Sequence, residues 1–269
     1  MEATTSSKLV DYRVKNGVAT FTLSFETANC YTHEMMSELD ACILKARFDD
    51  NVHVIVIRGA GDKFFCAGAD INMLKAVTPQ FKYYFCLHAN ETLNRLEHTP
   101  KLVIAALNGH TVGGGLEIAM ACDLRLARKG AGKLGLPEVT LGVLPGTGGT
   151  QRIARLVNKS TAIELMITGD LFTFEQGKEI GLVNRIIEAA DTNAFMDEVQ
   201  KFAESFCPPN RAAKAVGRIK RSVQSGSEVT FEQALAIERE LQQQLFQSED
   251  AKEGLAAYVE KRKPNFSGR

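Results

Sequence analysis

Two short, almost wholly apolar segments constrain the fold of this chain more than any other feature of its sequence. Val52–Ile57 is nearly all β-branched, and Leu102–Leu107 contains no polar residue. Continuous apolar runs of this length are typical of strands buried on both faces of a parallel sheet. Helical patterns such as Pro79–His98 lie between them. Because strand and helix alternate through roughly the first 190 residues, the sequence predicts an α/β domain with mainly parallel strands.

The remaining elements follow the same logic until a break near residue 208. Val18–Phe25 alternates apolar and hydroxyl residues, which predicts a half-buried strand, and His33–Arg47 has an apolar stripe at helical spacing. After Cys207–Asn210, which contains two consecutive prolines, the pattern is entirely helical, with one apolar stripe over Phe231–Leu245. We therefore expect a core over 1–207 and a C-terminal helical region over 208–269.

Charge and cysteine content exclude several classes of protein. The 32 basic and 32 acidic residues balance, which argues against a general binder of nucleic acid or of anionic membranes. The apolar runs are far too short to span a bilayer. Met1–Asp11 has the pattern of neither a secretory signal nor a transit peptide, and six scattered cysteines without a C-x-x-C pair indicate reduced thiols. We expect a cytoplasmic protein.

One motif is misleading. Gly130–Gly135 matches G-x-G-x-x-G, the fingerprint of a dinucleotide-binding turn. A helix should follow that turn, but Pro137 comes almost at once, and no acidic residue lies about 20 positions further on. We expect a plain flexible loop here.

Two glycine-containing segments are better candidates for a site. Phe65–Ile71 is rich in small residues, so its backbone can approach a ligand closely, although an ordinary strand-to-helix turn explains it too. Gly113–Gly115 precedes a predicted helix, whose first N–H groups are unpaired and lie at the positive end of the dipole. Such a helix start stabilises an oxyanion; close packing that admits only glycine is the alternative.

Two acidic residues lie next to these segments. Glu117 is one turn inside the same helix among apolar neighbours, and it is either functional or a surface charge. Glu138 is a lone acid in the apolar stretch Leu136–Thr150. Burial raises the pKa of a carboxyl toward the range useful for acid–base catalysis. A structural, ion-paired glutamate is the alternative for Glu138.

Taken together, these motifs resemble the crotonase (enoyl-CoA hydratase/isomerase) superfamily, and most closely its enoyl-CoA hydratases. The resemblance spans Gly17–Phe266 and includes Asn29, F-C-A-G-A-D, G-G-G-L-E, P-E-V-T-L-G-V-L-P-G-T-G-G-T and the closing E-K-R-K-P-N-F. It implies a ClpP-like spiral of ββα units with a C-terminal helical trimerisation region, assembled as a homotrimer or homohexamer.

The resemblance also implies roles for individual residues. Water adds to C3 of a 2-enoyl-CoA while C2 receives a proton. The backbone N–H groups of Ala69 and Gly114 would form the oxyanion hole, Glu117 would orient and deprotonate the water, and Glu138 would supply the proton. The residues expected to bind CoA or the acyl group are Lys63, Ala67, Asp70, Ile71 and Lys261, the last often from a neighbouring subunit, with Lys220 a weaker candidate. No metal is implied, and no cofactor beyond the CoA of the substrate.

Alternative functions within the superfamily remain open at this point. The enzyme alternatives are a Δ3,Δ2-enoyl-CoA isomerase and a hydratase for a branched, cyclic or dienoyl thioester. A catalytically dead acyl-CoA-binding relative would not need both glutamates. An RNA-binding relative would carry a lysine-rich helix, but His33–Arg47 has only Lys45 and Arg47, at its end. We therefore expect an acyl-CoA partner and neither a nucleic-acid nor a membrane partner.

Overall fold

The computed structural model describes residues 8–26 and 28–269. Most of Met1–Asp11, which lacks the pattern of a secretory signal or transit peptide, lies outside these ranges. None of the described helices combines the length and apolar character needed to cross a bilayer.

The described elements alternate as expected through the first part of the chain. The strands are β1 (Val10–Lys15), β2 (Val18–Leu23), β3 (Val54–Gly59), β4 (Phe64–Cys66), β5 (Leu102–Leu107), β6 (His110–Val112), β7 (Leu124–Arg128), β8 (Lys133–Gly135), β9 (Phe172–Thr173) and β10 (Arg185–Ile187). The helices are α1 (His33–Phe48), α2 (Ile71–Ala76), α3 (Pro79–Glu97), α4 (Gly114–Met120), the 3-10 helix η1 (Pro137–Leu141), α5 (Gly149–Leu156), α6 (Lys159–Thr168), α7 (Phe174–Glu179), α8 (Thr192–Glu204), α9 (Ala213–Gly226), α10 (Phe231–Phe246) and α11 (Glu249–Glu260).

Two sheets organise the core. The larger has the strand order β1-β2-β3-β5-β7-β10, and all its pairings are parallel except β1 with β2. The smaller has the order β4-β6-β8-β9 and is parallel except between β8 and β9. The described part of the chain therefore has the mainly parallel α/β architecture that the sequence predicts.

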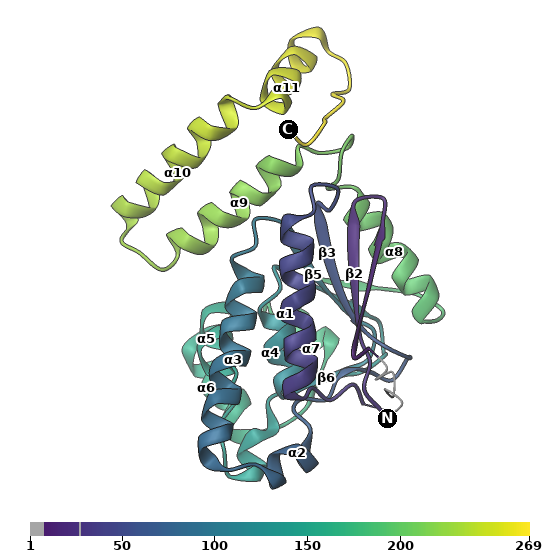
Figure 1. Ribbon diagram of the computed structural model, residues 1–269, viewed down its shortest axis with the longest axis vertical. Helices are drawn as coiled ribbons and strands as arrows, with labels where there is room; N and C mark the ends of the chain where they lie inside the picture. The colour runs from purple at the N-terminus through teal and green to yellow at the C-terminus, as the bar shows by residue number, and fades with distance from the viewer. Residues whose placement is uncertain (1–7, 27) are drawn as a thin grey trace, which may run out of the picture.

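The larger sheet is apolar on both faces because helices cover both. In β3, Ile55 and Ile57 belong to the cluster that includes α1 and α3, whereas Val54 and Val56 pack with Phe195 and other residues of α8. Figure 1 shows α1 and α3 side by side on one face and α8 on the other. Successive residues of a strand point to opposite faces, so an unbroken apolar run is what a doubly covered strand requires.

The G-x-G-x-x-G segment is not the flexible loop that we expected. Gly130 lies in a turn, but Lys133–Gly135 forms β8, which pairs with β6 and β9. A Cβ on Gly132 would lie only 2.5 Å from the backbone nitrogen of His110. The glycine spacing here therefore serves close packing of two backbones.

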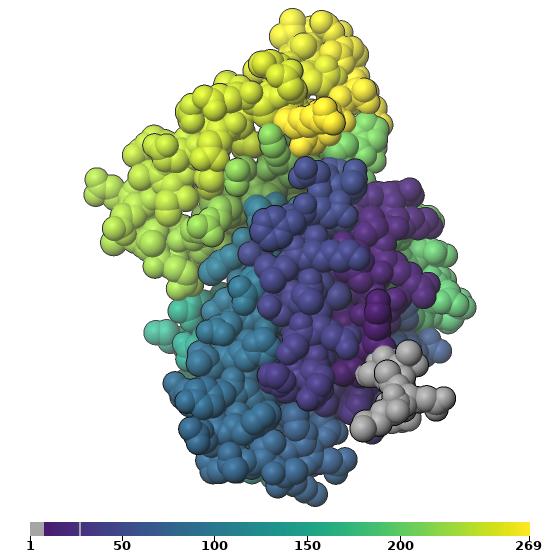
Figure 2. Space-filling model, in the orientation of Figure 1, coloured from purple at the N-terminus to yellow at the C-terminus, as the bar shows by residue number. Residues whose placement is uncertain are grey.

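The last three helices extend from one end of the molecule (Figures 1 and 2). Helix α10 packs on α9, and α11 is tied to the closing segment because Asp250 accepts hydrogen bonds from the N–H groups of Ser267 and Gly268 at 2.7 and 2.9 Å. The region after residue 208 is thus helical, as expected. Its status as a separate unit stays a prediction.

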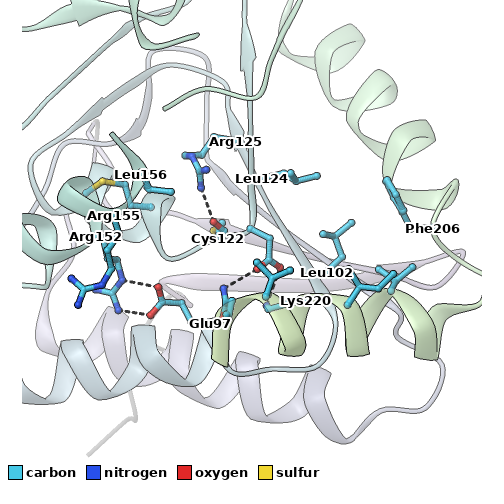
Figure 3. Close-up of a pocket in the computed structure, with 16 residues that line it drawn as sticks. Glu97, Leu102, Cys122, Leu124, Arg125, Arg152, Arg155, Leu156, Phe206 and Lys220 are labelled. Atoms are coloured by element: carbon cyan, nitrogen blue, oxygen red, sulfur yellow. Dashed lines mark hydrogen bonds and ion pairs between the residues drawn. The ribbon is translucent and has the colours of Figure 1, made fainter. Parts of the chain in front are cut away.

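Lys220 on α9 is buried, so its interpretation as a surface contact for CoA is wrong. Its Nζ lies 2.9 Å from Oδ2 of Asp123 and also donates to the carbonyl oxygens of Leu96 and Lys101 (Figure 3). Burial raises the pKa of Asp123 despite the nearby ammonium. The pair therefore helps to attach α9 to the core but gains little over an apolar contact.

Replacing only one member of this pair should be strongly destabilising. We expect Lys220→Met to lower the free energy of unfolding by about 3–5 kcal/mol, because the Asp123 carboxylate stays buried without its cation. The double variant with Asp123→Asn should recover part of the loss. Lys201→Met, which removes an exposed pair with Glu198, is the control, with an expected change below about 1 kcal/mol. Denaturant unfolding checks this, and equal losses for the two single variants would contradict it.

Candidate active site

A cavity of about 450 Å³ brings together the segments that the sequence singled out. Its walls come from the turn before α2, from the start of α4, from η1 and from the loop before α5. Six of the predicted site residues line it, namely Ala67, Ala69, Ile71, Gly114, Glu117 and Glu138. The motifs are therefore parts of one site, although they are far apart in the sequence.

Glu117 is buried, with 2% of its surface exposed, so the surface-charge alternative is wrong. Its Oε1 accepts hydrogen bonds from the N–H groups of Thr147 (2.8 Å) and Gly149 (2.7 Å). Thr147 lies in the loop before α5, and Gly149 is the first residue of that helix. Within the described chain no protein donor reaches Oε2, so one carboxyl oxygen is held in place and the other is available for chemistry.

The environment of Glu117 makes both protonation states accessible near neutral pH. Burial raises its pKa to about 7, and the nearby Glu138 carboxylate pushes the pKa in the same direction. The hydrogen bonds from Gly149 and Thr147 and the charge of Arg152 oppose this rise because they favour the ionised form. A carboxyl with a pKa near the working pH is suited to proton transfer.

Glu138 is half-buried on η1, and its Oε2 is buried without a hydrogen-bond partner among the described residues. In the described part of the chain, Glu138 takes part in no ion pair. The structure therefore does not support the alternative of a structural, ion-paired glutamate. Burial raises the pKa of Glu138, and the charge of Lys82 opposes the rise. A carboxyl in this setting favours its protonated form more than a solvated one does.

Two backbone N–H groups are available at the same cavity. Tyr31 donates to the carbonyl of Gly68 at 2.9 Å and accepts from the N–H of Asp70 at 3.1 Å. Because alternate residues of an extended segment present their N–H groups to opposite sides, that of Ala69 is directed away from Tyr31. Gly114 is the first residue of α4 and has no acceptor within the helix. Paired donors of this kind can bind a developing oxyanion.

The glycines at the start of α4 are required for packing, which confirms the packing alternative; their role in an oxyanion hole stays a prediction. Gly113 has φ 56° and ψ −132°, a conformation that side chains with a Cβ avoid. A Cβ on Gly114 would lie 2.3 Å from Cε1 of Tyr31, and one on Gly115 would lie 2.0 Å from the carbonyl oxygen of Cys66. The two donor segments approach closely because these positions lack side chains.

Three predicted binding residues do not line the cavity. The Asp70 carboxylate caps α2 by accepting from the N–H of Met73 at 2.7 Å. The Lys63 ammonium lies 5.6 Å from the centroid of the Phe64 ring. Lys261 is exposed at the end of α11, and Figure 1 places α11 and α2 at opposite ends of the molecule. Contacts of these residues with CoA stay predictions.

Tyr31 and Thr147 are site residues to which sequence reasoning assigned no role. The Tyr31 hydroxyl lies 3.0 Å from Oγ1 of Thr147, and both side chains are buried. Burial raises the pKa of Tyr31 well above its ordinary value, so this phenol stays neutral. Thr147 belongs to a motif that the sequence singled out, but nothing in the sequence marks Tyr31.

A second cavity, of about 570 Å³, lies between α9 and the core and contains none of the predicted catalytic residues. Two pairs of its charged side chains form ion pairs, Arg152 with Glu97, as Figure 3 shows, and Lys220 with Asp123. Among residues 8–26 and 28–269, no three side chains of His, Cys, Asp or Glu are grouped so as to hold a metal ion.

Comparisons with known proteins agree on one family. Residues 13–269 match the family model described as enoyl-CoA hydratase/isomerase. A probable enoyl-CoA hydratase of Bacillus subtilis is 35% identical over 96% of this chain and 98% of its own length, and the short-chain-enoyl-CoA hydratase of Clostridium acetobutylicum is 37% identical over 87% and 88%. A crystal structure of an enoyl-CoA hydratase from Geobacillus kaustophilus superimposes with a TM-score of 0.94 at 44% identity, covering 98% of both chains.

Proposed function

Because the chain belongs to the enoyl-CoA hydratase/isomerase family and has the crotonase fold, we propose that it hydrates a 2-enoyl-CoA thioester to the 3-hydroxyacyl-CoA. The observation that carries this proposal is the presence of two carboxyl groups and two backbone donors at one cavity. Addition of water across an activated double bond needs these groups: a base, an acid and a site for negative charge.

The backbone donors act on the thioester carbonyl. When water attacks C3, the π electrons move toward the carbonyl and its oxygen gains enolate character. The N–H groups of Ala69 and Gly114 stabilise this charge, and the dipole of α4 adds to their effect. Loss of one such donor costs about 3–4 kcal/mol of transition-state stabilisation in comparable sites.

The two glutamates divide the proton transfers. Glu117 is ionised at the start; its Oε1 is held by Thr147 and Gly149, and its free oxygen takes a proton from the water as the C3–O bond forms. Glu138 is protonated at the start and gives its proton to C2. Two carboxyl groups close enough to influence each other do not ionise together readily, which favours a pair that holds a single proton.

The rest of the proposal concerns binding and assembly. Ala67 and Ile71 contact the substrate in the cavity, and Asp70 supports the turn between them. Lys63 and Lys261 bind the phosphates of CoA, Lys261 from a neighbouring subunit of a homotrimer or homohexamer. Exposed apolar side chains on the C-terminal helices, such as Phe231 and Tyr258, support such an assembly. No other cofactor takes part, and the enzyme acts in the cytoplasm.

Hydration of crotonyl-CoA tests the proposal. We expect loss of the conjugated-thioester absorbance and formation of 3-hydroxybutyryl-CoA, identified by chromatography. A product that is an isomer rather than a hydrate would favour the isomerase alternative. If only a branched, cyclic or dienoyl thioester reacts, the substrate changes and the chemistry stands. Absence of hydration with all of these thioesters would contradict the proposed function.

The rate should depend on pH with a rising limb near neutrality. Glu117 must be ionised to act as base, and its pKa is about 7, so kcat/KM should rise as the pH passes through that value. Burial also raises the pKa of Glu138, which favours the protonated form that its role as the acid requires. The measurement is kcat/KM for crotonyl-CoA from about pH 5 to about pH 9. A flat profile across neutrality would contradict these protonation states.

A further inference from the structure

Thr147 uses all three of its polar groups at the candidate site. Its N–H donates to Oε1 of Glu117 (2.8 Å), its hydroxyl lies 3.0 Å from the Tyr31 hydroxyl, and its carbonyl accepts from Nη1 of Arg152 (3.0 Å). The residue is 1% exposed. Its position, and with it the direction of one donor to Glu117, therefore depends on the groups that hold its other two atoms.

Arg152 connects Thr147 to a different part of the core. Its guanidinium donates to both carboxylate oxygens of Glu97, through Nε at 3.0 Å and Nη2 at 2.7 Å, and Nη2 also reaches Oδ1 of Asn94 at 2.9 Å. Both acceptors lie in the last turns of α3. Figure 3 shows the two parallel bonds of Arg152 to Glu97. A bidentate pair of this kind has a fixed geometry, which a single point charge does not provide.

The neighbouring glycines show how closely Arg152 and the loop are fitted. A Cβ on Gly148 would lie 2.0 Å from Nη1 of Arg152, and a Cβ on Gly149 would lie 2.8 Å from Oε1 of Glu117. The loop 147–149 is thus in close contact with the guanidinium at one residue and with the carboxylate at the next. A shift of the guanidinium will therefore move the loop that donates to Glu117.

We propose that Arg152, anchored by Glu97 and Asn94, is a positioning residue for Glu117, because it fixes the Thr147 carbonyl and so keeps the Thr147 and Gly149 N–H groups on Oε1. Arg152 does not line the 450 Å³ cavity of the candidate active site; it acts through the loop. This inference rests on the proposed function, in which Glu117 is the base.

The same guanidinium contributes to the electrostatics of Glu117. Among the residues that the structure describes, the titratable groups that act on this carboxyl are Glu138, which raises its pKa, Arg152, which lowers it, and Tyr31, which stays neutral. Without the Arg152 charge, burial and the Glu138 carboxylate raise the pKa of Glu117 with less to counteract them. The pKa of Glu117 should rise, and the ascending limb of the rate profile should move to higher pH.

The test compares Arg152→Met, Arg152→Lys and Glu97→Gln with the matched control Arg155→Met. Arg155 lies on the same helix, but it is exposed and pairs with Glu228. For Arg152→Met we expect kcat with crotonyl-CoA to fall about 10- to 100-fold with KM nearly unchanged, and the limb to move to higher pH. Arg152→Lys keeps the positive charge, so the ascending limb of its pH–rate profile should stay at the wild-type pH, while kcat falls. Glu97→Gln should show a smaller loss of kcat, and Arg155→Met should match the wild type.

The possible outcomes separate this inference from the proposed function. If wild type is active but Arg152→Met retains its kcat and pH profile, the positioning role is wrong and the function stands. Thermal unfolding shows whether Arg152→Met folds. If it does not, Arg152→Lys and Glu97→Gln provide the test instead. A kcat equal to that of the wild type in both of these variants overturns the inference. If wild type hydrates no thioester, the proposed function fails. A carbon-13 NMR titration of Glu117 in folded wild type and Arg152→Met then tests the inference, and an unchanged pKa of Glu117 in Arg152→Met overturns it.

Discussion

Glu117→Gln should lower kcat for hydration by about 10²- to 10⁴-fold while the fold stays intact, because general acid–base groups contribute rate enhancements of this size. A glutamine keeps the carbonyl oxygen that accepts from Thr147 and Gly149 but cannot take a proton from water at neutral pH. The measurement is steady-state kinetics with crotonyl-CoA, together with thermal unfolding of the variant.

The same substitution at Glu138 should have a comparable effect for the opposite reason, since glutamine cannot supply an acidic proton to C2. Glu188→Gln is the matched control, because Glu188 is exposed and pairs with Lys129 on the surface. We expect its kcat to equal that of the wild type. If either Glu117→Gln or Glu138→Gln kept a near-wild-type kcat, the assignment of two catalytic carboxyl groups would fail.

The second large effect is expected from Gly114→Ala. The new methyl group would lie 2.3 Å from Cε1 of the buried Tyr31 ring, so the ring or the start of α4 must move. Movement of α4 displaces one of the two N–H donors, and loss of such a donor lowers kcat about 10²- to 10³-fold. The measurement is kcat for crotonyl-CoA, with circular dichroism to verify that the variant folds.

Gly130→Ala provides the control for this substitution. A Cβ at Gly130 meets nothing within 4 Å, although the residue has a positive φ of 67°. We expect a small loss of stability and an unchanged kcat, since Gly130 does not line the cavity. A Gly114→Ala enzyme with the kcat of the control would contradict the role of this helix start as an oxyanion hole.

Local patterns in the sequence predicted much of the fold and most residues of the candidate site. The β-branched run that became β3 indicated a doubly covered strand, since a strand with one solvated face would alternate. Glu117 and Glu138 stood out because isolated acids among apolar residues are costly to bury. These signals depend on neighbours in sequence, which a single chain displays directly.

The remaining features depend on contacts between distant segments. Lys220 was expected at the surface, but it is buried because Asp123, almost a hundred positions earlier in the chain, lies beside it. Tyr31 reaches Thr147 from 116 positions earlier in the chain. Arg152 lies close to Thr147 in sequence, but the residues that hold its guanidinium, Glu97 and Asn94, belong to α3. The glycine pattern of 130–135 was ambiguous for the same reason, because the backbone it packs against belongs to β6.

The start of α4 also limits how this protein can diverge. Gly113, Gly114 and Gly115 exclude a side chain for three separate reasons, namely a backbone conformation, an aromatic ring and a carbonyl oxygen. Every single-nucleotide missense change of a glycine codon adds at least a Cβ. Because the three positions exclude a Cβ for different reasons, one compensating substitution elsewhere would not make room for a side chain at all three. New substrate preferences in this scaffold should therefore evolve through other lining residues of the cavity, such as Ile71 and Leu144, whose side chains are exposed.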